Sequence, residues 1–524
     1  MKNLSVNKSI VILACVFILS VLVVPLASAT PLFFYNESKA EQSTTSTTYI
    51  DALTLNFTPP IQDDYLILAS GEMAIPSIAE EVSVKFDVDG NNANDSAVLR
   101  PKDIDDWFPF SFSKKVNLDS SNHYVKLRFN TSNAGIAASV RNLHLAAWSI
   151  DVEAYNESNG EFQIVNSSIN RTKLAVTPSS AGDYLIIATA QYTGPTTSLT
   201  NIKLFIDNEL AANTSKMSRL NSYYSFGVIK KLSLSASPHQ IDLELSNGVA
   251  TASFMRNARI SAIRLDQLVS NFYSEIESQN STTSTIHVTR LSSSYAPVKG
   301  IYLVIGTTHL KHATIGSSSL TRIAYDGTNL AGNVSVEPDN IADYISFFSF
   351  KKETLTATQR IENITYATTS GGAETFSKYV RLIALRMNDT DQPSISLGNP
   401  ATGTFTNSAN VTFFFTPNDV SSGIANCSLV VNSTINQSST AIVLMQENNI
   451  TTTLSDGLYA WTVNCTDDSP EHNIGTNTSE KIVTVDLTKP VIKVNSPLNN
   501  SYIYGSSSQL FSINVSESNS IKNA

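Results

Sequence analysis

The chain of 524 residues carries seven histidines, three cysteines and many carboxylates, the side chains from which catalytic and metal sites are most often built. The closest histidine pair, His309 and His312, would point to opposite faces of a β-strand. Adjacent carboxylates such as Asp105 and Asp106 would do the same, and no H-E-x-x-H, G-x-S-x-G, phosphate-loop or dinucleotide motif is present. The sequence therefore predicts no catalytic residue, no cofactor and no metal site, so we expect a protein that is not an enzyme. A β-sandwich glycosidase that gathers carboxylates from distant strands is the open alternative.

One segment carries oxygen ligands at alternating positions, as a hard cation such as calcium requires, namely Asp87, Asp89, Asn91 and Asp95. The glycine that a calcium loop needs at its sixth position is missing. Asp89-Gly90 is instead typical of a two-residue hairpin turn. A hairpin is therefore the favoured interpretation.

Two further groups of side chains could touch an extracellular polymer. The first is a lysine pair that occurs three times, at Lys114-Lys115, Lys230-Lys231 and Lys351-Lys352. The second consists of aromatic residues beside phenylalanine-rich strands, namely Trp107, Tyr223, Tyr224 and Tyr344. Lysines at a strand end more often protect an edge from pairing, and aromatic residues beside core positions more often pack the rim. Both structural interpretations are therefore favoured over ligand binding.

Internal repeats predict the architecture. The segment Asp64 to Ala69 recurs as Asp183 to Ala188 and as Ile301 to Gly306, so its tyrosines lie 119 and 118 residues apart. Alternating segments such as 241–245 indicate strands, and the mature chain shows no sustained helical period. We therefore expect an all-β protein with three tandem jelly-roll-like β-sandwich repeats arranged as a rod. The predicted boundaries are 30–150 for repeat 1, 151–268 for repeat 2 and 269–388 for repeat 3.

The segment after residue 388 differs from the repeats in its sequence pattern and carries both cysteines of the mature chain. Cys427 and Cys465 each share one face of a strand with apolar residues, so both point into a common core. Because export makes oxidation available, we predict a Cys427–Cys465 disulfide that links two sheets. In the chain-entropy model its closed loop is worth roughly 4 kcal/mol. Two unrelated buried thiols are the alternative.

The stretches around these cysteines, Ile424 to Leu429 and Asp456 to Asp467, resemble the Ig-like domains of archaeal cell-surface proteins. Residues 485–492 resemble the linker that joins such domains in tandem. The resemblance implies an Ig-like sandwich over 389–487 in an exported envelope protein, and it implies no catalytic residues. A second copy begins after residue 487, so we expect 488–524 to be a truncated, partial Ig-like domain and the natural protein to continue beyond it.

The N-terminus carries an export signal. Lysines precede an apolar run over 10–26, and Ala27-Ser28-Ala29 supplies a cleavage site, so residues 1–29 are a predicted signal peptide. An uncleaved membrane anchor is the alternative. The remaining chain contains 21 Asn-x-Ser/Thr sequons, about twice the number that composition alone would give, which predicts glycosylation. The named candidates are Asn36, Asn56, Asn156, Asn280, Asn410, Asn426 and Asn464.

The formal net charge is −10, from 35 Lys+Arg and 45 Asp+Glu, and no basic run is present, so we expect no nucleic-acid partner. We expect an extracellular or cell-surface glycoprotein that acts in recognition or adhesion. Its partners would be cell-surface or extracellular polymers, glycans or neighbouring envelope proteins. Membrane contact would come only through the signal segment or an anchor outside this sequence. The alternatives are a structural envelope or sheath component, and accessory binding modules of a secreted enzyme whose catalytic domain lies beyond residue 524.

Overall fold

The computed structural model describes residues 33–516 apart from short gaps, and every regular element in this part of the chain is a β-strand. The gaps are 60–61, 91–95, 101–106, 150–151, 166–169, 179, 217–221, 248–250, 266–270, 298, 326–327, 337–340, 357, 388–391, 420–422, 468–471, 501, 503, 506–507 and 509. The predicted signal peptide, Asn91, Asp95 and the Asp105–Asp106 pair lie outside the described residues. Within the described part, no helix is long and apolar enough to cross a membrane.

The first repeat is a sandwich of two antiparallel sheets. One sheet has the order β1-β9-β4-β7 and contains β1 (Phe33–Ser38), β9 (Ala138–Ser149), β4 (Asp63–Ala74) and β7 (Phe108–Leu118), with β2 (Gln42–Thr44) beside β9. The other has the order β3-β8-β5-β6 and contains β3 (Ile50–Phe57), β8 (His123–Thr131), β5 (Val82–Val88) and β6 (Ser96–Leu99). Apart from the pairs β1–β2 and β5–β6, successive strands lie in opposite sheets, which is the jelly-roll connection. Strand β8 shows the cause of the two layers, because every second residue from His123 to Thr131 is buried.

The second and third repeats have the same strand order. In the second repeat, one sheet contains β10 (Val152–Ser158), β18 (Ser253–Arg264), β13 (Gly182–Thr193) and β16 (Tyr224–Leu234), with β11 (Phe162–Ile164) beside β18. The sheet that faces it contains β12 (Asn170–Val176), β17 (His239–Asn247), β14 (Thr200–Ile206) and β15 (Glu209–Lys216). In the third repeat, one sheet contains β19 (Asn271–Ile276), β27 (Thr375–Arg386), β22 (Gly300–His312) and β25 (Ile345–Leu355), with β20 (Asn280–Thr282) beside β27. The sheet that faces it contains β21 (Val288–Tyr295), β26 (Arg360–Thr368), β23 (Ser319–Tyr325) and β24 (Thr328–Val336). The predicted all-β, jelly-roll fold class is confirmed.

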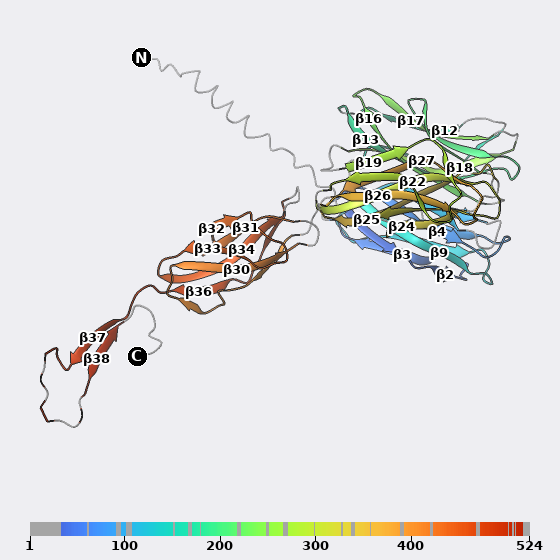
Figure 1. Ribbon diagram of the computed structural model, residues 1–524. Coiled ribbons are helices and arrows are strands. Elements are labelled where there is room, and N and C mark those ends of the chain that lie inside the picture. Colours follow the sequence, from blue (N-terminus) through green and yellow to red (C-terminus); the bar gives the residue numbers. More distant parts are fainter. Residues whose placement is uncertain are drawn as a thin grey trace, which may run out of the picture.

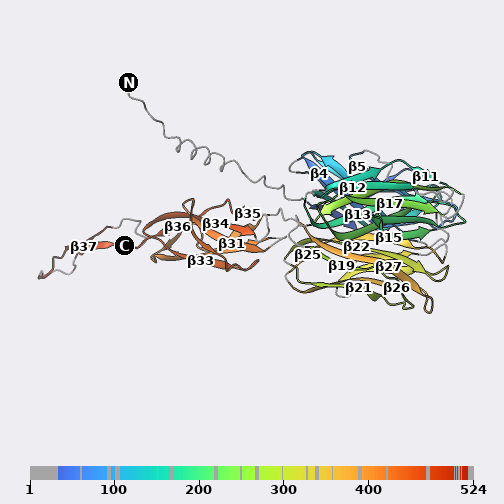
Figure 2. The same cartoon turned by 90° about the horizontal axis from the view of Figure 1, so that it is seen from above.

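The three repeats pack around one another in one compact body, so the expected rod is wrong (Figures 1 and 2). Residues of all three repeats, among them Trp148, Ile187 and Phe350, form a second core between the sandwiches. The sheets that contain β4, β13 and β22 therefore face inward, and β7, β16 and β25 contact one another. The sequence signal for this was the run from Tyr65 to Ala69 in β4, which is apolar at every position and fully buried. A sheet that is apolar on both faces needs cover on both.

The Ig-like unit lies beyond this body (Figure 1). Its first sheet contains β28 (Ser394–Leu397), β30 (Asn410–Asn418) and β33 (Asn448–Thr453). The second contains β29 (Thr404–Thr406), β36 (Lys481–Val485), β34 (Gly457–Asp467), β31 (Ile424–Val431) and β32 (Thr434–Ser439), with β35 (Ile474–Thr476) beside β34. The core between them includes an edge-to-face contact of Phe413 and Trp461, whose ring centroids are 4.9 Å apart.

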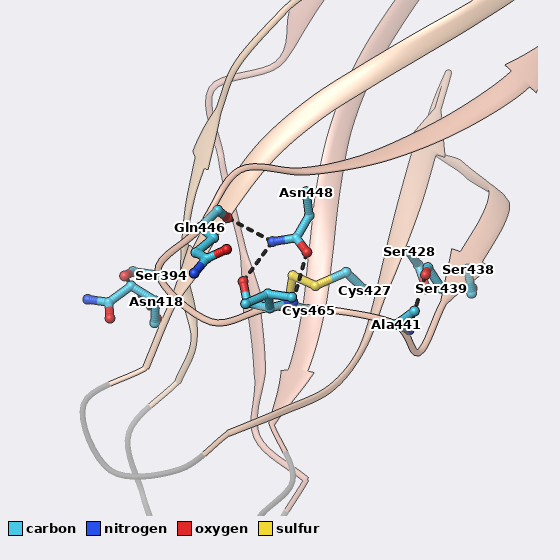
Figure 3. Close-up of a disulfide and its surroundings, with 11 residues drawn as sticks. Ser394, Asn418, Cys427, Ser428, Ser438, Ser439, Ala441, Gln446, Asn448 and Cys465 are labelled. Carbon is cyan, nitrogen blue, oxygen red and sulfur yellow. Dashed lines mark hydrogen bonds between the residues drawn. A yellow bond between two sulfur atoms is a disulfide. The ribbon is translucent and has the colours of Figure 1, made fainter.

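The predicted Cys427–Cys465 disulfide is confirmed, and both cysteines are fully buried (Figure 3). It does not link two sheets, however. The two residues lie directly opposite each other on the neighbouring strands β31 and β34, with their Cα atoms 4.0 Å apart. Alternation fixed the face to which each cysteine points, but it carried no information about which sheet each strand joins.

The last described strands, β37 (Val491–Ser496) and β38 (Ser512–Ser516), form a two-stranded sheet. Apolar and aromatic side chains around it are exposed, including Tyr504, Leu510 and Phe511.

Candidate functional site

One histidine in the first repeat has the neighbours of a hydrolytic relay. His123 Nδ1 lies 2.7 Å from Asp89 Oδ2, and Ser121 Oγ lies 3.4 Å from His123 Nε2. A relay requires Nε2 to accept the serine proton. Here Nε2 lies 3.1 Å from the carbonyl oxygen of Asp119, which can only accept, so both ring nitrogens donate. The histidine therefore acts as a clamp between Asp89 and Asp119, a geometry that does not favour a general base.

The electrostatics agree with this assignment. Burial lowers the pKa of His123, but hydrogen bonds to Asp89 and Asp119 and their negative charges outweigh burial and raise the pKa above its usual value. The clamp ties the turn before β8 to the turn after β5. It is repeated in the second repeat, where His239 Nδ1 lies 2.7 Å from Asp207 Oδ2 and Nε2 lies 3.2 Å from the Ser235 carbonyl oxygen.

The clamp in the second repeat holds a two-residue hairpin turn at Asp207–Asn208, where Ile206 pairs with Glu209. In the first repeat it holds the turn predicted at Asp89-Gly90, and the residues that follow this turn, 91–95, lie outside the described ones. Asp207 and Asn208 have φ values of 50° and 70°, and Asp89 has a φ of 51°, the positive values that a two-residue hairpin turn needs. Asp87 is 2 % exposed and lies 3.5 Å from an Arg128 nitrogen, so its carboxylate faces a cation. No group of three metal-binding side chains occurs among the described residues. The calcium hypothesis gains no support.

A pocket of about 410 Å³ lies beside the first clamp. Its lining residues are Gln62, Val88, Asp89, Lys114, Val116, Asn117, Leu118, Asp119 and His123. The Asn117 side chain already donates to Asp64 at 2.8 Å and accepts from Gln62 at 2.7 Å. The Asn117 and Gln62 side chains of this pocket are thus already engaged in hydrogen bonds.

Three of the aromatic residues singled out in the sequence, Tyr223, Tyr224 and Tyr344, pack at the boundaries between repeats. Three of the rings are covered by cations at matching positions: Trp107 by Arg141 at 3.8 Å, Tyr223 by Arg256 at 3.6 Å and Tyr344 by Lys378 at 4.0 Å from the ring centroid. Tyr224 is buried. The backbone of Tyr223 pairs with Val98 of the preceding repeat, and that of Tyr344 with Ser215. These contacts favour rim packing over sugar binding, since the covered faces cannot stack on a sugar.

The repeated lysine pairs also act at boundaries. Lys230 of the second repeat lies 2.9 Å from both carboxylate oxygens of Glu275 in the third, and 2.6 Å from Glu277. Lys115 pairs instead with Asp64 of its own repeat at 2.8 Å. These lysines join strands and repeats, which leaves the polymer-binding hypothesis without support.

The three repeats meet at one tightly packed junction. The Ser111 amide donates to Ser225 Oγ at 3.0 Å, and the Gly227 amide donates to Ser346 Oγ at 3.1 Å. A Cβ atom on Gly227 would lie 2.5 Å from Ser111 Oγ and 2.8 Å from Phe348 Cβ. Glycine is therefore required because three backbones approach closely here.

A buried ion pair lies near this junction. Lys216 Nζ lies 3.2 Å from Asp343 Oδ2, and both side chains are fully buried. The same ammonium group lies 5.3 Å from the Phe108 ring centroid and 4.5 Å from that of Tyr224, so it contacts all three repeats. A buried pair of this kind is costly to break, because the remaining charge would be left unpaired.

The outer sheet of the first repeat carries the most distinctive exposed chemistry. We define the first-repeat outer surface as Tyr49, Lys85, Tyr124, Lys126 and Arg128. Lys85 lies 4.5 Å from the Tyr49 ring centroid, and Lys126 lies 4.9 Å from that of Tyr124. Asp51 accepts from Lys126 at 2.6 Å and from Arg128 at 2.8 Å. The cations of this surface can contact an acidic polymer through their charge, whereas Lys85 and Lys126 each cover a face of the neighbouring tyrosine ring.

The glycosylation candidates fall into two classes. Asn56, Asn280 and Asn410 are exposed, whereas Asn36, Asn156, Asn426 and Asn464 are half-buried. The Asn36 side-chain nitrogen donates to the Thr54 carbonyl oxygen at 2.7 Å, and the Asn464 side-chain oxygen is buried without a hydrogen-bond partner. Glycosylation of every candidate stays a prediction.

Comparisons with known proteins give weak likenesses. No protein-family model and no curated protein matches the chain. The fibronectin(III)-like modules of Clostridium thermocellum CbhA share 10% identity, over 38% of this chain and 86% of theirs, with a TM-score of 0.16. Ruminococcus gnavus β-glucuronidase has 7% sequence identity over 39% of this chain and 36% of its own, with a TM-score of 0.13. An archaeal virus protein described by its triple jelly-roll fold and turret assembly has 10% sequence identity over 68% of this chain and 91% of its own, with a TM-score of 0.15. The fold assignment therefore depends on the strand order, and the resemblance to archaeal cell-surface proteins stays an expectation.

Proposed function

We propose that this chain is an exported cell-surface glycoprotein that acts in extracellular recognition or adhesion and has no catalytic activity. The observation that carries the proposal is the first-repeat outer surface, which combines cations and tyrosines on a sheet that faces away from the shared core. The disulfide supports an extracellular location, because such bonds persist in oxidising compartments. The proposed partner is a cell-surface or extracellular glycan that carries negative charge.

The compact body changes how the protein would engage such a partner. Because the outer sheets of the repeats surround one core, they face different directions and cannot all lie on one flat polymer. The three outer sheets therefore do not act as a row of sites that would bind one flat polymer with increased avidity.

The test is binding of the purified chain to immobilised acidic and neutral polysaccharides. The double change Lys85→Ala and Lys126→Ala is expected to lower binding to the acidic polymer at least tenfold, and added salt should weaken the wild-type interaction. Lys203→Ala on the outer sheet of the second repeat is the matched control and should bind like the wild type. Equal binding by all three proteins would contradict the proposal.

A structural role in an envelope or sheath is the second candidate. It is favoured by the use of the lysine pairs and aromatic rims in contacts between repeats. Light scattering over a concentration series separates the two functions. Ordered assembly without any added polymer would favour the structural role, whereas a monomer that binds polymer would favour recognition.

A further inference from the structure

Two buried histidines lie at the two boundaries of the third repeat. His144 of the first repeat is 1 % exposed, and its ring centroid lies 5.8 Å from that of Phe350 in the third repeat. His309 of the third repeat is fully buried, and its Nδ1 lies 2.6 Å from the carbonyl oxygen of Asn213 in the second repeat. Each histidine is thus part of a contact between the third repeat and one of its neighbours.

The remaining boundary, between the first and second repeats, is built differently. In the aligned strand registers, His144 corresponds to Arg259 of the second repeat, and His309 corresponds to Gln191. Arg259 pairs with Glu157 at 3.1 Å, and Gln191 donates to the Ser111 carbonyl oxygen of the first repeat at 3.5 Å. Neither side chain changes its charge between pH 4 and 7.

Both histidine rings are held in environments that reject a second proton. The Nε2 atoms of His144 and His309 are buried and have no hydrogen-bond partner. Burial lowers the pKa of His144 to about 3, and the charges of Lys351 and Lys39 act in the same direction. Burial likewise lowers the pKa of His309 to about 3, with further lowering from Lys378 and Arg381.

The other groups around His144 include one carboxylate, which favours a charged imidazole but does not outweigh burial. Tyr35 Oη lies 2.8 Å from His144 Nδ1, and Tyr35 also donates to Glu37 at 2.7 Å. Glu37 lies 3.6 Å from the ring nitrogen. On β25, Lys351 pairs with Glu353 at 2.7 Å.

Around His309, the nearest side chains are aromatic or cationic, and Arg381 is itself paired with Glu275 and Glu277 at 3.2 Å. The Phe226 and Tyr379 ring centroids lie 5.8 and 5.7 Å from that of the imidazole. Lys378 and Arg381 approach from β27.

We propose that the third repeat is an acid-released element: protonation of His144 and His309 detaches it from the first two repeats, which stay joined to each other. Release exposes side chains of the shared core, among them Phe348 and Phe350. The proposal concerns a conformational change and is independent of the proposed binding function.

The pH dependence follows from proton uptake. We call the equilibrium constant for detachment of the third repeat the opening constant. A histidine that is neutral in the closed state and takes up a proton on release raises this constant about tenfold for each pH unit below its ordinary pKa of about 6.5. Two such histidines acting together give up to about a hundredfold per unit. The range from pH 6.5 to 5 lies above the ordinary carboxylate pKa values. Burial raises the pKa of two carboxyl groups in the body, Glu72, which accepts from the Ser335 amide across the first–third boundary, and Glu362 within the third repeat, so the histidine variants below are needed to assign the change.

The experiment measures amide hydrogen exchange of the full chain at single-residue resolution, corrected for intrinsic exchange. The Tyr344 amide donates to the Ser215 carbonyl oxygen across the boundary of the third repeat, at 2.7 Å. The Tyr223 amide donates across the first boundary to Val98, also at 2.7 Å. The opening constant at Tyr344 should rise between tenfold and a hundredfold per pH unit, while that at Tyr223 stays unchanged.

Variants then assign the change to the histidines. His144→Gln or His309→Gln should reduce the slope at Tyr344 to about tenfold per unit, and the double variant should abolish it. His472→Gln, at an exposed position of the Ig-like unit, is the control and should keep the wild-type slope. An identical pH dependence at both amides, or none at Tyr344, would overturn the proposal. The wild-type comparison decides this even if the double variant does not fold.

Discussion

At the scale of single residues, Glu362 departs from the pattern of its repeat. The register of β26 with β23 places it where the core residues Val125 and Ile241 lie in the other two repeats. The side chain is 1 % exposed, and burial raises its pKa to about 7. With a pKa of about 7, the carboxyl group is about half protonated at pH 7.

This predicts that the protein loses stability as the pH rises. The folded pKa lies above the ordinary value of 4.5, so the folded state binds the proton more tightly than the unfolded state does. The contribution of Glu362 is therefore fully present below pH 4.5 and is lost as the pH passes 7, at a cost of roughly 3 kcal/mol. Glu362→Ile, which restores the residue type of the second repeat, should remove this loss.

Urea unfolding at pH 5 and pH 8 measures the effect. The stabilisation by Glu362→Ile should be about 2 kcal/mol larger at pH 8 than at pH 5. Glu362→Gln keeps the size of the side chain without its charge and should flatten the pH dependence in the same way. A gain that is the same at both pH values would show that the effect comes from packing and not from ionisation.

At the scale of strands, the junction of β7, β16 and β25 depends on Gly227. Gly227→Ala places a methyl group within 2.8 Å of atoms from both neighbouring repeats, so it should destabilise the body by about 1–3 kcal/mol. Gly160→Ala is the matched control, because no atom lies within 4 Å of the position that its added Cβ atom would occupy, and the stability should be nearly unchanged. Thermal unfolding of both variants checks the prediction. Equal melting temperatures would mean that the three strands are not tightly packed in solution.

The strands also show how far sequence patterns reach. Alternation over 241–245 predicted a strand, and β17 contains these residues. The positive φ angles at Asp89 and Gly90 followed from local chemistry alone. The apolar run in β4 required burial on both faces, yet the covering residues come from repeats more than 100 positions away, such as Phe350. His144 and His309 carried no motif. Their environment became visible only once the fold aligned them with Arg259 and Gln191.

At the scale of the whole molecule, the shared core makes the three repeats one cooperative body and leaves the Ig-like unit separate. Core residues of the repeats form two clusters that each span all three sandwiches, whereas the Ig-like unit has its own cluster, which includes Cys427 and Cys465. Opening one sandwich would therefore expose apolar surface on its two neighbours.

Calorimetry should accordingly show two unfolding transitions, one for the triple jelly-roll body and one for the Ig-like unit. A reducing agent removes a disulfide that closes a loop with a sequence separation of 38, which is worth roughly 4 kcal/mol to the Ig-like unit in the chain-entropy model. Reduction should lower the melting temperature of the Ig-like unit, the smaller transition, by tens of degrees. The melting temperature of the triple jelly-roll body, the larger transition, should stay unchanged, because the body contains no part of this bond. The double change Cys427→Ala and Cys465→Ala is the control, and it should place the smaller transition at the reduced position without any reductant. Three separate transitions for the body would contradict the shared core, since repeats that unfold independently cannot depend on one another for the burial of their inner sheets.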